Sequence, residues 1–195
     1  MRSKNVYEGC LASSDCKDSS KSVCNTSTTT CVSCLANTDC TNASVSRCDT
    51  TTNTCTTCSA DSDCSQISGK NVCSSGTCVQ CTGTKYSACG TSNGKQLVCD
   101  SLSSTCSTTA TAQSAGLCKT CVSDAQCPAG QLCYQETFGG KAVGYFCFWK
   151  QGDTTNGAPA NCFSSAGRPY MKVESDVTSI DGSVATLCTL RSTTC

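Results

Sequence analysis

Short apolar groups separated by polar runs predict that this chain is built mainly from β-hairpins. Near the N-terminus, Val23-Cys24 and Cys31-Val32 flank a run of Asn, Ser and Thr. Valine and threonine on either side of a polar run are typical of two short strands joined by a turn. The same pattern recurs as far as residues 100–106, so we expect one small hairpin in each of several consecutive segments.

Two longer hairpins are predicted in the C-terminal part of the chain. Residues 131–137 and 141–150 flank a Phe-Gly-Gly turn, and residues 170–177 and 183–191 flank an Asp-Gly turn. The second pair alternates apolar and polar residues, as half-buried strands do. Eight of the ten aromatic residues follow position 130, so we expect the main hydrophobic cluster here.

The cysteines repeat with a fixed spacing through the N-terminal half. Gaps of five, seven, six and two residues separate Cys10, Cys16, Cys24, Cys31 and Cys34. The pattern then repeats from Cys34, returns with small changes from Cys58 and loosens from Cys81. A constant period of this size indicates a tandem repeat array.

This pattern predicts a small disulfide-rich fold of β-hairpins and irregular turns. An N-terminal segment (1–9) would precede the repeats (10–106), which would form an elongated rod. A small-residue linker (107–117) would connect them to a compact β-rich domain (118–195). The four predicted repeats span 10–33, 34–57, 58–80 and 81–106.

The 24 cysteines among 195 residues indicate disulfides formed in an oxidising compartment. We therefore expect an extracellular or cell-surface location. Residues 1–9 lack the apolar segment of a signal peptide, so we expect a trimmed piece of a longer secreted precursor. A cytosolic product that starts at an unprocessed Met1 would contradict this expectation.

The charge and hydropathy of the chain argue against two kinds of partner. Fourteen basic residues balance fourteen acidic ones, with no basic run that would bind nucleic acid. No stretch reaches the roughly 18 apolar residues of a membrane span.

The recurring Cys-x-x-Cys motifs have three interpretations: a zinc site, a redox dithiol or a junction between two disulfide-bonded units. We favour the junction, because the motif recurs at every boundary between repeats and the chain is expected to be oxidised. Four cysteines allow three connectivities, and we predict first-to-third and second-to-fourth pairing. The predicted bridges are Cys10–Cys24, Cys16–Cys31, Cys34–Cys48, Cys40–Cys55, Cys58–Cys73 and Cys64–Cys78. Residues 81–195 are left without a predicted pairing.

The acidic residues predict neither a metal site nor a catalytic centre. Asp15, Asp39 and Asp63 each precede a second cysteine. We expect them to form turns, in which the side chain accepts a backbone N–H two residues further on, in preference to binding calcium. Without histidine there is no Ser-His or Cys-His pair, so we predict a non-enzyme with no cofactor. The scattered carboxylates are expected on the solvated surface: Glu136, Asp153, Glu174 and Asp181.

Two sequons, at Asn25 and Asn42, lie in polar gaps where glycans would not disturb packing. Chance is the alternative in a chain so rich in Ser and Thr. For a protein partner, we predict contacts through an aromatic strand that contains Tyr145, Phe146, Phe148 and Trp149.

The repeat Cys-x5-Cys-x7-Cys-x6-Cys-x2-Cys, with Asp before the second cysteine and Thr before the fourth, resembles the cysteine-rich repeats of protist surface proteins, such as ciliate immobilisation antigens. Residues 121–133 are similar to a module of Dickkopf-type secreted antagonists. Parasite variant surface proteins share the Cys-x-x-Cys richness, but their membrane anchor and tail motif are absent here. None of these resemblances implies a ligand or an active site at a named position.

We therefore expect an extracellular structural or surface-coat protein that assembles into a filament or coat. Its expected partners are further copies of itself or other matrix and coat proteins, together with covalent glycans. The alternative from a different class is a secreted ligand, receptor-binding or inhibitor module. One exposed loop with an unusual side chain at its tip would favour that alternative.

Overall fold

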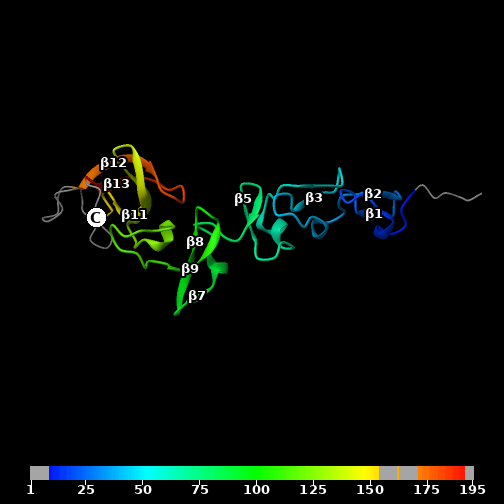
Figure 1. Ribbon diagram of the computed structural model, residues 1–195, viewed down its shortest axis with the longest axis horizontal. Helices are drawn as coiled ribbons and strands as arrows, with labels where there is room; N and C mark the ends of the chain where they lie inside the picture. The colour runs from blue at the N-terminus through cyan, green and yellow to red at the C-terminus, as the bar shows by residue number, and fades with distance from the viewer. Residues whose placement is uncertain (1–8, 154–161, 163–170, 192–195) are drawn as a thin grey trace, which may run out of the picture. The chain divides into compact units, whose positions relative to one another are not determined.

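The computed structural model describes residues 9–153, 162 and 171–191 of the chain. They form two compact units, Met1–Val79 and Gln80–Cys195 (Figure 1). The predicted N-terminal segment lies outside the described residues except for Gly9. Both units consist of small antiparallel sheets and single 3-10 turns, which is the disulfide-rich β fold that the sequence predicts.

The first unit contains three copies of one element, a 3-10 turn followed by a two-stranded hairpin. The hairpins are short because only three residues on each side pair, with the third and fourth cysteines of the repeat directly opposite each other. The elements are η1 (Ser13–Asp15), β1 (Val23–Asn25), β2 (Thr30–Val32), η2 (Asn37–Asp39), β3 (Arg47–Asp49), β4 (Thr54–Thr56), η3 (Asp61–Cys64), β5 (Val72–Ser74) and β6 (Thr77–Val79).

The second unit contains a three-stranded sheet and a four-stranded sheet. Their orders are β7-β8-β9 and β10-β11-β13-β12, so β13 lies between β11 and β12, and the outer strands of the larger sheet are β10 and β12. The elements are η4 (Ser87–Cys89), β7 (Thr91–Ser92), β8 (Lys95–Asp100), β9 (Thr105–Thr111), η5 (Asp124–Gln126), β10 (Gln131–Phe138), β11 (Lys141–Lys150), β12 (Met171–Thr178) and β13 (Val184–Leu190).

Disulfides follow one rule in every repeat. In residues 10–80 the first cysteine pairs with the third and the second with the fourth, which is the pairing predicted from the spacing. The bridges Cys81–Cys99 and Cys89–Cys106 extend the rule to a fourth repeat.

The same rule enters the C-terminal sheet, where the sequence offered no pairing. Cys121–Cys133 and Cys127–Cys147 again join first to third and second to fourth cysteines. We call residues 121–147 repeat 5, because η5 and the β10–β11 hairpin stand where a 3-10 turn and a hairpin stand in the other repeats. Outside this rule, Cys162 pairs with Cys188, and Cys118 is also disulfide-bonded.

A side-chain oxygen three residues after the first cysteine fixes the backbone of the third cysteine in four repeats. The acceptor and donor residues, joined at 2.8–3.1 Å, are Ser13 and Cys24, Asn37 and Cys48, Asp61 and Cys73, and Asp124 and Cys133. The sequence shows a polar residue at each acceptor position. Other polar residues stand beside it, so the spacing from the first cysteine does not by itself identify the acceptor.

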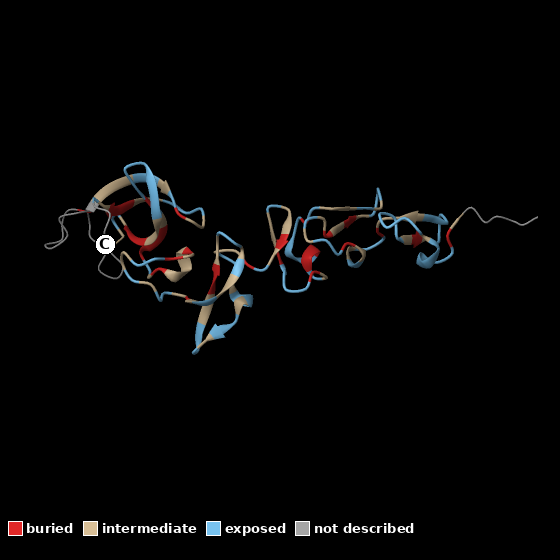
Figure 2. Cartoon of the chain, in the orientation of Figure 1, coloured by how far each residue is buried: buried red, intermediate tan, exposed pale blue. Residues whose placement is uncertain are grey.

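Buried residues form only short segments of the chain (Figure 2), and most of the buried hydrophobic residues are cysteines. In the second repeat, for example, the buried cluster is Cys34, Cys40 and Cys48. Larger side chains are buried in the four-stranded sheet, with Phe148 and Leu187 in one cluster and Trp149 in another. A chain with so little apolar burial depends on its cross-links, each worth about 3 kcal/mol for loops of this length.

The predicted linker over 107–117 is wrong for its first half. Residues 107–111 continue strand β9, and Thr111 is buried. Beyond the strand, the N–H of Gln113 donates to the carbonyl of Ala125, and the N–H of Ala115 donates to that of Gln126. Small polar residues predict a flexible segment, but here their backbone is hydrogen-bonded to β8 and to the turn η5.

Candidate functional site

The cysteines come together in groups of three that resemble metal-ligand sets by distance alone. In each repeat three sulfurs lie within 4.8 Å of one another, as for Cys34, Cys40 and Cys48. They approach because two disulfides lie side by side, and all of these sulfurs are bonded to another sulfur. A metal binds the thiolate form of cysteine, so these groups are structural cross-links as they stand.

Asp15, Asp39 and Asp63 shape the 3-10 turns, although by a different bond from the one predicted. We expected each side chain to bond an amide further along the chain. The Oδ2 atom of Asp15 instead accepts the preceding N–H groups of Leu11 and Ala12, both at 2.9 Å. Asp39 and Asp63 repeat this arrangement. The N–H of Leu11, followed by that of Ala12, holds the pKa of Asp15 below its usual value.

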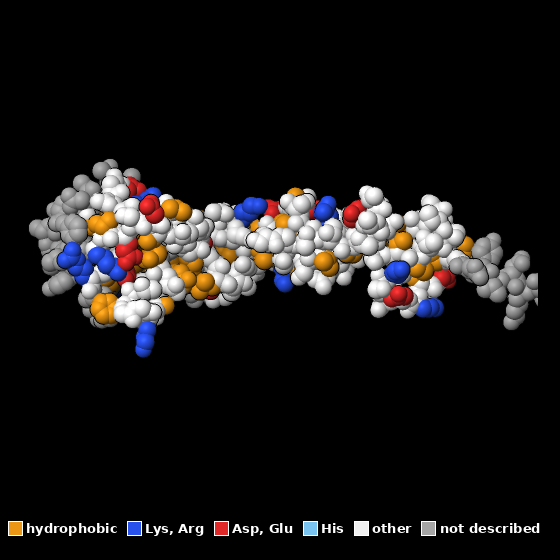
Figure 3. Space-filling view, turned by 90° about the horizontal axis from the view of Figure 1, so that it is seen from above, with side chains coloured by type: hydrophobic (Ala, Val, Ile, Leu, Met, Phe, Trp, Pro, Cys, Tyr) orange, Lys and Arg blue, Asp and Glu red, His pale blue; other side chains and the backbone are white. Residues whose placement is uncertain are grey.

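The two sequons share one local geometry. The Oδ1 atom of Asn25 accepts the N–H of Ser27 at 3.1 Å, and that of Asn42 accepts the N–H of Ser44 at 2.9 Å. These bonds engage the Oδ1 of each amide and do not use the Nδ2, the atom to which a glycan attaches. On the face seen in Figure 3, charged and hydrophobic side chains are scattered over the repeats among other side chains and backbone, a surface that fits the setting of a glycan.

The aromatic strand predicted as a contact surface is mainly part of the core. Phe148 is fully buried and Trp149 is 6% exposed, so the prediction is wrong for these two residues. Tyr145 and Phe146 are half-buried: Tyr145 packs against the cysteines of repeat 5, and Phe146 packs against the cluster that contains Phe148. The sequence shows an aromatic run, but a buried face is revealed only when β13 pairs with the end of β11.

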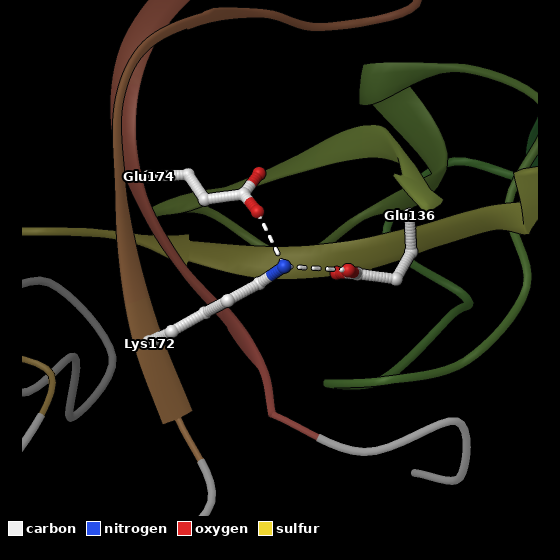
Figure 4. Close-up of polar contacts among 3 residues, drawn as sticks. All are labelled: Glu136, Lys172 and Glu174. Carbon is white, nitrogen blue, oxygen red and sulfur yellow. Dashed lines mark ion pairs between the residues drawn. The ribbon is translucent and has the colours of Figure 1, made fainter. Parts of the chain in front are cut away.

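A cluster of three charged side chains lies in the four-stranded sheet, around Lys172 (Figure 4). Its Nζ is 3.1 Å from an oxygen of Glu136 and 2.5 Å from an oxygen of Glu174. Glu136 is on β10 and Lys172 is on β12, the two outer strands, so the sheet curls to bring them together. The expectation of a solvated surface is therefore wrong for Glu136, which is 2% exposed.

Electrostatic effects in this cluster follow from burial and close contact. Burial lowers the pKa of Lys172, but its hydrogen bonds to Glu174 and Glu136 outweigh that effect, and the pKa is raised overall. Burial, together with the hydrogen bond to Glu174, raises the pKa of Tyr134 to about 12. One amine held by two carboxylates is an arrangement that ties strands together.

A second polar network connects repeat 5 with the β12–β13 turn. Asp124 accepts the Ser179 hydroxyl at 2.6 Å, while its own N–H donates to Asp181 at 2.6 Å. Asp181 also accepts the Ser101 hydroxyl, and Gly83 lies so close to its carboxylate that a Cβ there would clash. Burial, with a smaller contribution from the charge of Asp181, raises the pKa of Asp124.

The sequence offered no route to these two networks. Lys172 and Glu174 are two residues apart on one strand and therefore share a face, a signal that the pattern contains. The contact of Lys172 with Glu136 joins residues 36 positions apart, and that of Asp124 with Ser179 joins residues 55 positions apart. Such pairings depend on the sheet order.

Comparisons with protein-family models, with curated proteins and with solved structures gave no match. Within the described part of the chain, none of the helical turns has the length and apolar character needed to cross a membrane.

Proposed function

We propose that this protein is an extracellular structural or surface-coat protein without catalytic activity. The observation that carries the proposal is the repetition of one disulfide pattern through five consecutive repeats. Eleven bridges join described residues, and none of the described cysteines is free. This covalent pattern is compatible with an oxidising extracellular setting.

Cross-linked repeats suit a protein that must persist outside the cell. Each repeat is held by its own two bridges, so local damage in one repeat leaves the next intact. The polar loops between the cysteines carry the two sequons, and covalent glycans would add to a protective surface. We propose self-assembly or association with other coat proteins as the mode of action, since outer strands such as β12 present backbone groups for pairing.

Electron microscopy of native material tests this proposal. We expect filaments, sheets or a surface layer, and we expect sedimentation to show concentration-dependent oligomers of the purified protein. A monodisperse monomer at high concentration, together with isolated globules in the micrographs, would refute the structural role. Turnover of a carbohydrate or peptide substrate in a broad panel would refute the assignment as a non-enzyme.

One observation favours a ligand or receptor-binding role as the second candidate. Leu102 is 69% exposed in the turn between β8 and β9. Ser27 and Thr51 occupy the same position in the turns of the first two repeats. An apolar side chain at a turn tip is suited to burial in a partner's pocket.

A binding comparison separates the two candidates. Labelled protein would be titrated onto the surface of the cells that produce it, as wild type and as Leu102→Ser. A tenfold or greater loss in the variant, with unchanged binding by a Thr51→Ala control, would favour the receptor-binding role. Equal binding by all three proteins would leave the coat as the better proposal.

A further inference from the structure

Repeats 1 (10–33), 2 (34–57) and 3 (58–80) contact one another in two different ways. Between repeats 2 and 3 hydrogen bonds connect the two repeats directly and close the junction. The Nε2 atom of Gln66 donates to the carbonyls of Cys40 at 3.2 Å and Ser46 at 2.5 Å. The N–H of Cys78 donates to the carbonyl of Ala43 at 2.8 Å. Ser46 and Cys78 are consequently buried.

Between repeats 1 and 2 the same positions surround a hollow of about 350 Å³. By position in the repeat, Asn42 corresponds to Gln66 and Cys55 corresponds to Cys78. The counterparts of Ala43 and Ser46 in repeat 1 are Ser19 and Ser22. All four of these counterparts (Ser19, Ser22, Asn42 and Cys55) line the hollow, and Ser22 is exposed where Ser46 is buried. Across this junction, the N–H of Ser33 in the connecting peptide donates to the carbonyl of Asn53 at 3.2 Å.

The two junctions differ because the position two residues after the second cysteine holds Gln66 in repeat 3 and Asn42 in repeat 2. Gln66 is long enough to reach two carbonyls of the preceding repeat. Asn42 is one methylene shorter, and its Oδ1 is already held by the N–H of Ser44. Among the described residues, none accepts a hydrogen bond from its Nδ2. The residue that fails to close the junction is also the asparagine of a sequon.

We propose that this hollow seats the first sugar of a glycan linked to Asn42. The proposal rests on the extracellular role proposed above. In the linkage, Nδ2 loses a proton and bonds to C1 of N-acetylglucosamine, while a polyprenyl diphosphate leaves the sugar. The sugar takes the place that the Gln66 side chain fills one repeat later, and it bridges repeat 1 to repeat 2.

The lining of the hollow suits an amido sugar. A volume of about 350 Å³ is at the lower end of the roughly 300–1,000 Å³ typical of small-ligand sites. Hydroxyl groups and one carboxylate supply partners for sugar hydroxyls, and Val45 offers an apolar contact for the acetamide methyl. The polar lining residues are Ser19, Ser20, Ser22, Ser33, Asp39, Thr41 and Thr54.

Asn25 provides a matched control, since its sequon has the same side-chain bond and its residues do not line the hollow. The full chain would be secreted from a eukaryotic host as Ser27→Ala, which keeps the Asn42 sequon, and as Ser44→Ala, which keeps the Asn25 sequon. Both serines use only their backbone N–H in the bonds described above, so both variants are expected to fold. An endoglycosidase would then trim each glycan to one N-acetylglucosamine.

For Ser27→Ala we expect nuclear Overhauser contacts between the acetamide methyl and Val45 or Thr54. We also expect amide exchange in β4 to be roughly fivefold slower than in the same variant without sugar, the effect of one or two added hydrogen bonds. The Ser44→Ala glycoform should show neither change.

Two results would overturn the proposal: a sugar on Asn42 without these contacts or protection, and modification of Asn25 with Asn42 left bare. The coat function is tested separately. A monomeric protein whose Asn42 sugar lies in the hollow would refute the coat function alone. A protein that forms filaments while its Asn42 sugar is free in solvent would refute the sugar-binding proposal alone.

Discussion

Lys172 provides a direct test of how the C-terminal sheet is stabilised. Replacing it with methionine keeps most of the aliphatic stem but removes the charge that faces Glu136. The side chain of Glu136 is 3% exposed, so in the variant its carboxylate would lie buried without a counter-ion. Breaking a buried ion pair by removing one partner is far more damaging than removing both.

The expected loss follows from the burial of the two partners. Removing one partner of a buried ion pair costs about 3–5 kcal/mol, because the other charge is left buried and unpaired. The side chain of Lys172 is 32% exposed, so water reaches one end of this pair and the lower end of that range applies. We therefore expect Lys172→Met to lower the free energy of unfolding by about 3 kcal/mol at pH 7.

The only tryptophan of the chain makes the measurement local. Trp149 is buried in this sheet, so its fluorescence during denaturant unfolding of the full, oxidised chain reports on the sheet. The double variant Glu136→Gln/Lys172→Met should recover to within about 1 kcal/mol of wild type. Lys150→Met is the matched control, because its pair with Asp153 is more exposed and should be worth less than about 1 kcal/mol. A Lys172→Met deficit no larger than that of Lys150→Met, or one that persists in the double variant, would refute the reasoning.

Three further variants test other parts of the fold. Burial raises the pKa of Asp124. The stability that the protonated carboxyl contributes is therefore fully present below the unfolded pKa of about 4 and is lost as the pH rises through the raised folded pKa. Asp124→Asn should flatten that loss of stability with pH in the tryptophan assay. Thr29 is a β-branched residue with a positive φ of 54°, and Asn53 has the corresponding position in the next repeat. Asparagine adopts this conformation with less strain, so Thr29→Asn should slow hydrogen exchange in repeat 1 by roughly fivefold. Unchanged or faster exchange would count against strain at Thr29. Gln66→Ala leaves two carbonyls unsatisfied and should speed exchange of the Cys78 amide by about tenfold; equal rates would mean that Gln66 does not close the junction.

Prediction from the sequence succeeded where the interactions are local. The hairpins and the six bridges of residues 10–80 join groups no more than 15 positions apart, and their cysteine and valine–threonine patterns repeat. The C-terminal strands were also predicted to within about two residues of their bounds, because alternation and Gly turns are local signals. The linker over residues 107–117 was mispredicted because small polar residues fit equally well in an extended strand such as β9.

Spacing along the chain specifies the repeat, its cross-links and the chemistry available to it, because the bridged cysteines of residues 10–80 lie at most 15 positions apart. Packing between distant segments specifies which side chains are buried. The order β10-β11-β13-β12 buries Phe148 and brings Glu136 to Lys172, and no local pattern encodes that order. The fit between neighbouring repeats likewise decided that Gln66 closes one junction while Asn42 lines an open one. Each outcome depends on residues far apart in the chain, whose meeting is set by packing and not by spacing.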